Sequence, residues 1–291
     1  MVFMSTHPIS LLAERFPQLR VPLSPGARDS TLYKQLVLRG QESDLVPPGF
    51  SFSAADELKA WQTPVGPAEV LYLENRADFE RCVCALAYRC EPRVVPASMG
   101  ATTISGLNDW KKIRDHRKAY EANGGTAWQD EFKRFIADPA NYRATLILVS
   151  SGFYSAVSPE AAGLLPEEWL DFSLTIRTFH ELTHFVCRRR YPQDVDPIRD
   201  EVIADAIGLV AAFGTYDPRK AALFLGIEAE EYRHGGRLEN YSKEGLSLEA
   251  SIHIARIWVQ RMVEALGQTA YTDPFAPLHR LMKSQQGNNM V

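Results

Sequence analysis

The chain has 291 residues, of which 45% are hydrophobic and 23% charged, and its formal net charge is −4. These values are typical of a globular protein of one large or two smaller domains, long enough to bury a substantial core without disulfides. The mild acidity, and the lack of a basic stripe with interleaved aromatic residues, argue against a nucleic-acid or anionic-membrane partner.

The N-terminus and the cysteines bear on the compartment. The first twenty residues have no basic region followed by a long apolar segment, so we expect no signal peptide and a cytoplasmic location. No stretch is long and apolar enough for a transmembrane helix. The spacing of Cys82, Cys84, Cys90 and Cys187 matches no common zinc motif. We therefore expect reduced, half-buried thiols.

Residues 1–100 form an irregular, proline-rich region. Prolines recur from Pro17 to Pro67, which excludes a continuous helix or a central strand there. We expect this region to wrap over the surface with short helices, for example at "AADELKAW". Its last part predicts a strand at Glu69–Leu73, followed by a helix from the N-cap Asn75 to about Arg89.

Residues 101–291 predict a second domain. The segment "EPRVVPASMGATTISGLNDW" before and at its start indicates a loop or edge strand that could line a cleft. Two helices follow, in "NDWKKIRDHRKAYEANGG" and "WQDEFKRFIADP". The apolar "YRATLILVSSGFYSAVS" predicts one strand or a hairpin, and the remainder is almost entirely helical. The expected fold class is α+β, with a small sheet before a mostly helical region.

The motif "FHELTHF" lies in a segment with clear helix signals. Pro166 fits the first helical position, acidic residues follow it, three arginines suit the carboxyl end, and Pro192 enforces the stop. His180 and His184 are therefore one turn apart on one face, where two imidazoles can reach the same metal ion at roughly 2 Å each. Glu181 is rotated by about 100° and can accept a proton from a water that the metal activates.

The next predicted helix offers a third ligand. In "DVDPIRDEVIADAIGLVAAFG", Asp196 fits the N-cap and Gly214 the carboxyl-terminal stop. Glu201 and Asp205 are one turn apart on an otherwise apolar helix, so they need an electrostatic partner unless they form a solvated acidic face. We predict that Glu201 binds the zinc, and that Asp205 accepts the second N–H of a ligand histidine, His180.

The segments "HELTH" and "EVIAD" together resemble the gluzincin group of zinc metallopeptidases, to which the thermolysin-like enzymes belong. In that group one helix carries H-E-x-x-H and a following helix supplies a glutamate ligand within E-x-x-x-D. The resemblance covers about thirty residues of the 291. The gap between the two segments is shorter than is usual in the group, which predicts a tight loop. The third histidine of the metzincins is absent from "FVCRRRYPQDV".

The resemblance also implies two supporting elements. An edge strand before the motif helix binds an extended peptide in that fold, and "ATLILVSSGFYSAV" is positioned to be this strand. A downstream His or Tyr stabilises the oxyanion, and the candidates here are His234, Tyr241 and His253. Arg237, in "HGGRLENY", could hold a carboxylate.

These features predict a zinc-dependent hydrolase with one Zn²⁺ per chain, held by His180, His184 and Glu201. The favoured activity is that of a metallopeptidase acting on a peptide or a small-molecule amide, with Glu181 as general base. One alternative is a specialised biosynthetic or accessory metalloenzyme on the same scaffold. A second is a non-catalytic zinc-containing binding protein. The residues leave the substrate, the oligomeric state and the physiological metal open.

Overall fold

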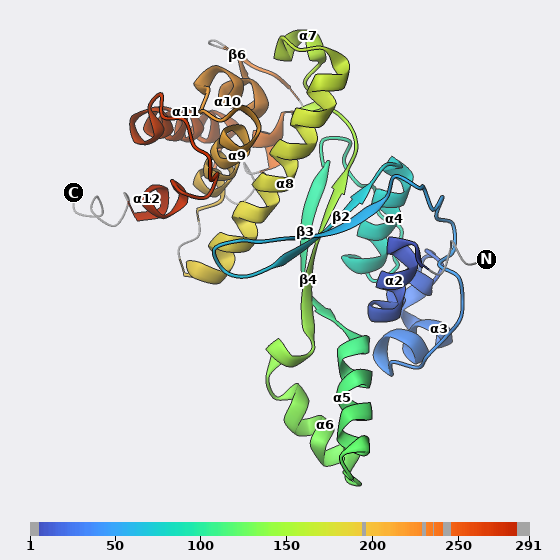
Figure 1. The fold of residues 1–291 in the computed structure, drawn as a ribbon. Coiled ribbons are helices and arrows are strands. Elements are labelled where there is room, and N and C mark those ends of the chain that lie inside the picture. The colour runs from blue at the N-terminus through green and yellow to red at the C-terminus, as the bar shows by residue number, and fades with distance from the viewer. Residues whose placement is uncertain (1–5, 194–195, 229–230, 235, 241–245, 284–291) are drawn as a thin grey trace. The chain divides into compact units, whose positions relative to one another are not determined.

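The computed structural model describes residues 6–193, 196–228, 231–234, 236–240 and 246–283, and it confirms an α+β fold (Figure 1). The chain forms two compact units. The first comprises the chain up to Ala60, with Glu69–Val95 and Thr103–Ser150, and the second comprises Trp61–Ala68, Pro96–Thr102 and the residues from Ser151. These units have other bounds than the two predicted domains, residues 1–100 and 101–291. The predicted domain boundary stays a prediction.

Most of the four-stranded mixed sheet lies in the first unit. Its strands are β1 (Glu57–Trp61), β2 (Ala68–Leu73), β3 (Ala101–Asn108) and β4 (Arg143–Ser150), in the order β1-β2-β4-β3. Strands β2 and β4 are parallel, with Glu69 opposite Leu146 and Leu73 opposite Ser150. The strand predicted at Glu69–Leu73 is thereby confirmed.

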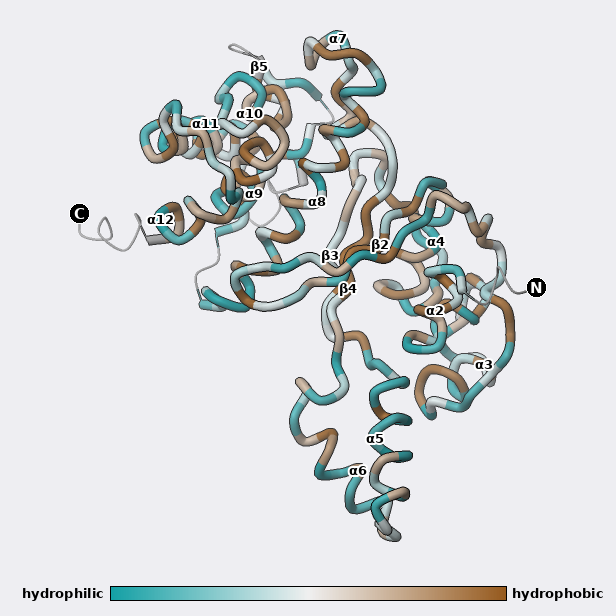
Figure 2. Tube along the Cα trace, in the orientation of Figure 1, coloured by the Kyte–Doolittle hydropathy of each residue, from teal (hydrophilic) through white to brown (hydrophobic). Residues whose placement is uncertain are grey.

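Strand β4 is an inner strand, so its prediction as a substrate-binding edge strand is wrong. It lies between β2 and β3, and its residues Leu146–Val149 are completely buried. This apolar run is visible in Figure 2. A strand covered on both faces is uniformly apolar rather than alternating, which is the pattern that the sequence carries here. The edge positions belong to β1 and β3.

The N-terminal part of the first unit contains short helices, as expected. They are α2 (Pro8–Arg15), η1 (Pro17–Arg20), η2 (Ala27–Asp29), α3 (Thr31–Tyr33) and η3 (Lys34–Leu38). The helix predicted at "AADELKAW" is wrong, because Glu57–Trp61 forms strand β1 beside β2. Ala, Glu, Leu and Lys favour helix only weakly, and pairing in a sheet overrides such a preference.

Helix α4 (Arg76–Leu86) begins as predicted, since the Asn75 side chain accepts the Ala77 N–H at 2.8 Å. It ends before Arg89, because Arg89 and Cys90 have φ values of 56° and 65°, which a right-handed helix cannot contain. The four cysteines carry free thiols. Three of them are buried, and Cys187 is intermediate.

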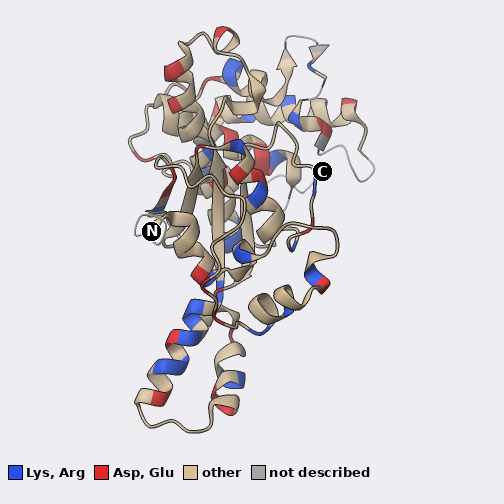
Figure 3. Cartoon of the chain, turned by 90° about the vertical axis from the view of Figure 1, so that its right-hand side faces the viewer, with Lys and Arg blue, Asp and Glu red and all other residues tan. Residues whose placement is uncertain are grey.

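The two helices predicted after residue 108 are confirmed as α5 (Trp110–Ala122) and α6 (Trp128–Ile136), followed by η4 (Pro139–Asn141). They form a hairpin in which His116 stacks on Phe135, with 4.1 Å between ring centroids. Lysines and arginines are dense on this hairpin, at the bottom of Figure 3, and acidic residues alternate with them.

The second unit is mostly helical (Figure 1). Helix α8 runs from Pro166 to Arg190 and α9 from Pro197 to Phe213, which confirms both predicted helices and their ends. The remaining elements are η5 (Tyr154–Ala156), α7 (Pro159–Ala162), α10 (Pro218–Leu225), β5 (Ile227–Glu228), β6 (Glu231–Tyr232), η6 (Arg237–Asn240), α11 (Leu248–Leu266) and α12 (Leu278–Lys283). Among the described residues, no helix has the length and apolar character needed to cross a membrane.

Helices α8 and α9 pack closely against each other. At Gly208 a Cβ atom would lie 2.9 Å from the backbone oxygen of Ile176, closer than real Cβ contacts. Gly208 therefore permits the approach of the two backbones at this point. Ile176 is one turn before His180, and Asp205 is nearly one turn before Gly208, so this contact sets the distance between the two helices next to the predicted site.

We expect Gly208→Ala to destabilise the protein by about 1–3 kcal/mol, because the added methyl group meets the backbone of α8. Helix propensity alone predicts the opposite sign, since Ala is better than Gly in a helix by about 1 kcal/mol. Thermal unfolding measures the difference. Ala211→Gly, at a half-buried position of α9, calibrates the propensity effect. A rise in Tm for Gly208→Ala would contradict the close approach.

Candidate metal centre

The structure brings three potential metal ligands together from two helices. Helix α8 supplies His180 and His184, and α9 supplies Glu201. One donor atom from each lies within 4.8 Å of the others, so the three residues could hold a metal ion. His180 is buried, and His184 and Glu201 are half-buried.

The separations of the donor atoms fit a single small ion. His180 Nε2 lies 3.1 Å from His184 Nε2 and 3.3 Å from Glu201 Oε2, and His184 Nε2 lies 3.2 Å from Glu201 Oε1. Ligands at about 2 Å from a tetrahedral ion are roughly 3.3 Å apart. Two imidazoles and a carboxylate are also a donor set that zinc accepts. The residues present therefore fit a zinc ion.

The second ring nitrogen of His180, Nδ1, is hydrogen-bonded to a carboxylate of α9. It lies 2.9 Å from Asp205 Oδ1, and Asp205 is completely buried. This is the contact that the spacing in α9 led us to expect. A carboxylate at Nδ1 fixes the ring orientation and the tautomer in which Nε2 is free to bind a metal.

Sequence reasoning missed Tyr154, which lies in η5. Its hydroxyl donates to Asp205 Oδ1 at 2.6 Å and lies 3.1 Å from His180 Nδ1. Ser173 accepts the Tyr154 backbone N–H at 2.9 Å, and Arg177 donates to the carbonyl of Phe153, so α8 positions this loop. The only signal available was a tyrosine in an apolar segment, whose hydroxyl needs a partner when it is buried.

Arg237, in η6, donates to both acidic residues. Its Nη2 lies 2.7 Å from Glu201 Oε2, and its Nη1 lies 3.0 Å from Asp205 Oδ1. The same Nη1 is 2.6 Å from the Tyr154 hydroxyl and 3.4 Å from Ser155 Oγ. The sequence nominated Arg237 as a residue that could hold a carboxylate, and it holds two.

These contacts determine the charges of the cluster. Burial opposes the charged form of His180, but Glu201 and Asp205 outweigh it and raise the pKa of His180 to about 9. Burial likewise opposes ionisation of Glu201, yet His184 and His180 hold its pKa well below the usual range. At Asp205, Arg237 and then His180 outweigh burial and lower the pKa. In the metal-free chain His180 carries a proton that a metal must displace.

The predicted general base is part of the same helix turn. Glu181 follows His180 in α8 and is buried. Consecutive residues of an α-helix are about 100° apart around the helix axis, so Glu181 points in a different direction from His180. It is therefore directed away from the face that meets Asp205.

Two of the three predicted oxyanion-stabilising residues, His234 and His253, lie on exposed parts of the second unit. The His234 side chain is 94% exposed and lies 3.9 Å from Glu239. His253 is exposed on α11. Tyr241 lies outside the described residues.

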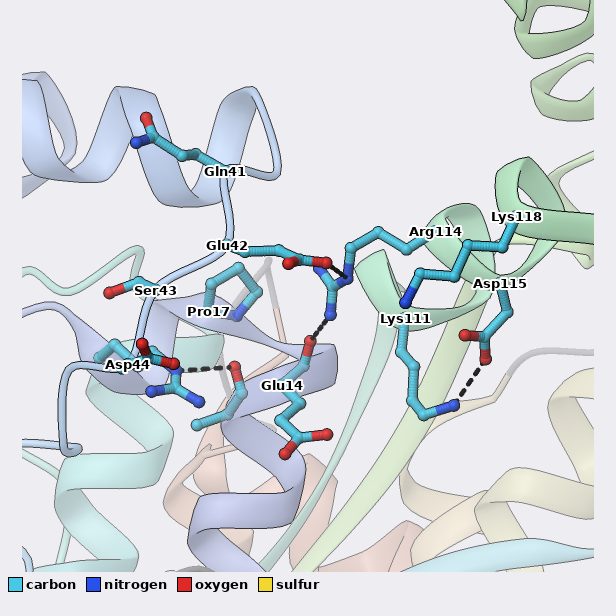
Figure 4. A pocket seen from close by; sticks show the side chains of 12 residues that line it. Glu14, Pro17, Gln41, Glu42, Ser43, Asp44, Lys111, Arg114, Asp115 and Lys118 are labelled. Atoms are coloured by element: carbon cyan, nitrogen blue, oxygen red, sulfur yellow. Dashed lines mark hydrogen bonds and ion pairs between the residues drawn. The ribbon is translucent and has the colours of Figure 1, made fainter. Parts of the chain in front are cut away.

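The first unit holds a polar pocket of about 260 Å³ (Figure 4). Arg114 pairs with Glu42 at 3.1 Å, and Lys111 pairs with Asp115 at 2.6 Å. Basic and acidic side chains line it in equal number: Arg20, Lys111, Arg114 and Lys118 against Glu14, Glu42, Asp44 and Asp115. Charges that largely compensate one another leave little net field for a charged ligand. The histidine cluster is therefore the stronger candidate site.

Comparison with known proteins gives a family but no described activity. No curated protein and no solved structure matches the chain. One family model matches residues 4–274, which include most of both compact units and every residue of the histidine cluster. By this match the chain belongs to DUF7005, a family of unknown function.

Proposed function

We propose that this protein is a zinc-dependent hydrolase of the zincin type, with zinc held by His180, His184 and Glu201. The observation that carries the proposal is the set of separations of 3.1–3.3 Å that join the two histidine nitrogens to each other and each of them to one Glu201 oxygen, across two packed helices. The motif in which these residues occur, with its similarity to the gluzincin metallopeptidases, supports zinc and hydrolysis rather than another metal chemistry.

Zinc held by these residues would polarise a carbonyl group and make a water molecule acidic enough to lose a proton near neutral pH. Glu181 would accept that proton on its carboxylate and return it to the amine, which leaves as the oxygen of the water replaces it on the carbonyl carbon. Asp205 keeps the proton of His180 on Nδ1 throughout. His180 and His184 would thus hold the metal from one face of α8, and Glu181 would transfer the proton from a neighbouring face.

A catalytic role is favoured over a purely structural one by the number of ligands. Within the described residues the metal-ligating group contains three members, whereas structural zinc sites have four. Asp205 cannot supply the fourth without breaking its bonds to His180 and Arg237. The substrate class that we propose is a peptide or a small-molecule amide. A panel of generic peptides separates a general peptidase from a specialised enzyme with one dedicated substrate.

The first prediction of the proposed function concerns metal content. The purified protein should carry about one zinc per chain, and His180→Ala or His184→Ala should lose it, because each removes one of three ligands. Elemental analysis of the purified variants measures this. His253→Ala, at an exposed position of α11, should keep the metal. Full zinc content in both cluster variants would end the site proposal.

The second prediction compares two adjacent acidic residues. Glu201→Ala should lower metal affinity far more than Asp200→Ala. Glu201 faces both histidines, whereas the Asp200 carboxylate binds the guanidinium of Arg199 at 2.8 Å and 3.0 Å. Competition with a chelator measures both affinities. The reverse order would move the ligand to Asp200.

The third prediction separates metal binding from catalysis. Glu181→Gln keeps the size of the side chain but cannot accept a proton. Zinc content and Tm should be unchanged, while turnover of a substrate found in a peptide and amide screen should fall by roughly 10²–10⁴-fold. Turnover at the wild-type rate would show that the hydrolytic mechanism is wrong, although the metal site could stand.

A further inference from the structure

Arg237 has a position that the hydrolytic mechanism does not use. It is 9% exposed, and its two terminal nitrogens reach both acidic residues of the cluster, the half-buried Glu201 and the buried Asp205. Nη2 binds Glu201, the proposed ligand. Nη1 binds Asp205, the partner of His180. One guanidinium thus connects to two of the three proposed ligands, directly to Glu201 and through Asp205 to His180.

The two oxygens of Glu201 differ in their contact with Arg237. Each oxygen lies near one histidine, Oε2 at 3.3 Å from His180 Nε2 and Oε1 at 3.2 Å from His184 Nε2, but Oε2 also accepts a charge-assisted hydrogen bond from Arg237 Nη2 at 2.7 Å. A hydrogen bond from a guanidinium occupies a lone pair of the oxygen that accepts it and draws negative charge toward that oxygen. Oε1 is therefore the oxygen that remains for an ion between the two histidines.

The orientation of the guanidinium is fixed independently of any metal. Nη1 is 2.6 Å from the Tyr154 hydroxyl and 3.4 Å from Ser155 Oγ, so η5 holds the far side of the group. The Arg237 guanidinium carbon also lies 5.4 Å from the centre of the Tyr154 ring. A planar group with this many hydrogen bonds cannot turn without breaking several of them. A lysine ammonium could not make the same set of hydrogen bonds.

We propose that Arg237 is a positioning residue of the metal centre, which holds Glu201 so that it binds the metal through one oxygen only. The inference rests on the proposed metal site. It explains why the protein would supply three ligand atoms to the metal rather than four. A one-oxygen carboxylate and two imidazoles leave a position open for a water or a substrate carbonyl, which a two-oxygen carboxylate would fill. The guanidinium also offsets one of the two negative charges that the carboxylates place around the ion.

The test uses the full-length chain, stripped of metal and reloaded with Zn²⁺ or Co²⁺. Arg237→Met removes the charge and the donors at similar side-chain length, and Arg237→Lys keeps the charge but cannot bind Glu201, Asp205 and Tyr154 together. Arg233→Met is the matched control, because Arg233 lies in the same segment and donates to the backbone oxygen of Leu223 at 3.2 Å. Metal affinity is measured by chelator competition, and the absorption spectrum of the Co²⁺ form reports the number of ligands.

We expect Arg237→Met to weaken Zn²⁺ binding by roughly 10–100-fold, the range found when a partner of a metal ligand is lost. Its Co²⁺ absorption should weaken as well, because Glu201 can then turn both oxygens to the ion and raise the coordination number. Arg237→Lys should show the same spectral change with a smaller loss of affinity. Arg233→Met should match the wild type in both measurements.

Wild-type affinity and spectrum in Arg237→Met would overturn the inference while leaving the proposed function intact. If Arg237→Met does not fold, Arg237→Lys decides, and a wild-type Co²⁺ spectrum in that variant overturns the inference equally. A wild-type chain that binds neither Zn²⁺ nor Co²⁺ overturns both this inference and the proposed function.

Discussion

Two carboxylates on one apolar helix are the constraint on which the second unit depends. Most residues of helix α9 are buried, and Asp205 in its middle is completely inaccessible to solvent. An ionised carboxylate in such a place costs several kcal/mol unless partners offset it. Helix α9 can therefore pack against α8 only in the register that sets Asp205 against His180. Gly208 is compatible with the same register, because the absence of a side chain leaves room for the backbone of α8 at Ile176.

This network connects segments that are far apart in the chain. Tyr154 comes from η5, His180 from α8, Asp205 from α9 and Arg237 from η6, and all four side chains meet within hydrogen-bonding distance. A buried polar network whose members are all paired favours one arrangement over its competitors. Because Arg237 and the protonated His180 supply the counter-charges, we expect the fold to form before the metal binds. This differs from small zinc domains, in which the metal provides the folding energy.

Local signals made the two helices and the cluster of three candidate ligands predictable. Pro166 and Asp196 start the two helices, Gly214 ends the second, and the period of 3.6 residues places His180 and His184 on one face. Tyr154 was not predicted, and for Arg237 only a carboxylate partner was predicted and not which one. Both residues come from short elements whose position only tertiary packing decides.

The errors in strand prediction have two different causes. The helix expected at 54–61 rested on weak propensities that pairing with β2 overrode. The edge position expected for β4 came from the resemblance, although the unbroken apolar run at Leu146–Val149 already indicated an inner strand. A family pattern carried onto this strand thus outweighed a physical signal that was present in the residues. Helix α8 was predicted correctly, because the family motif and the local helix signals both indicate a helix there.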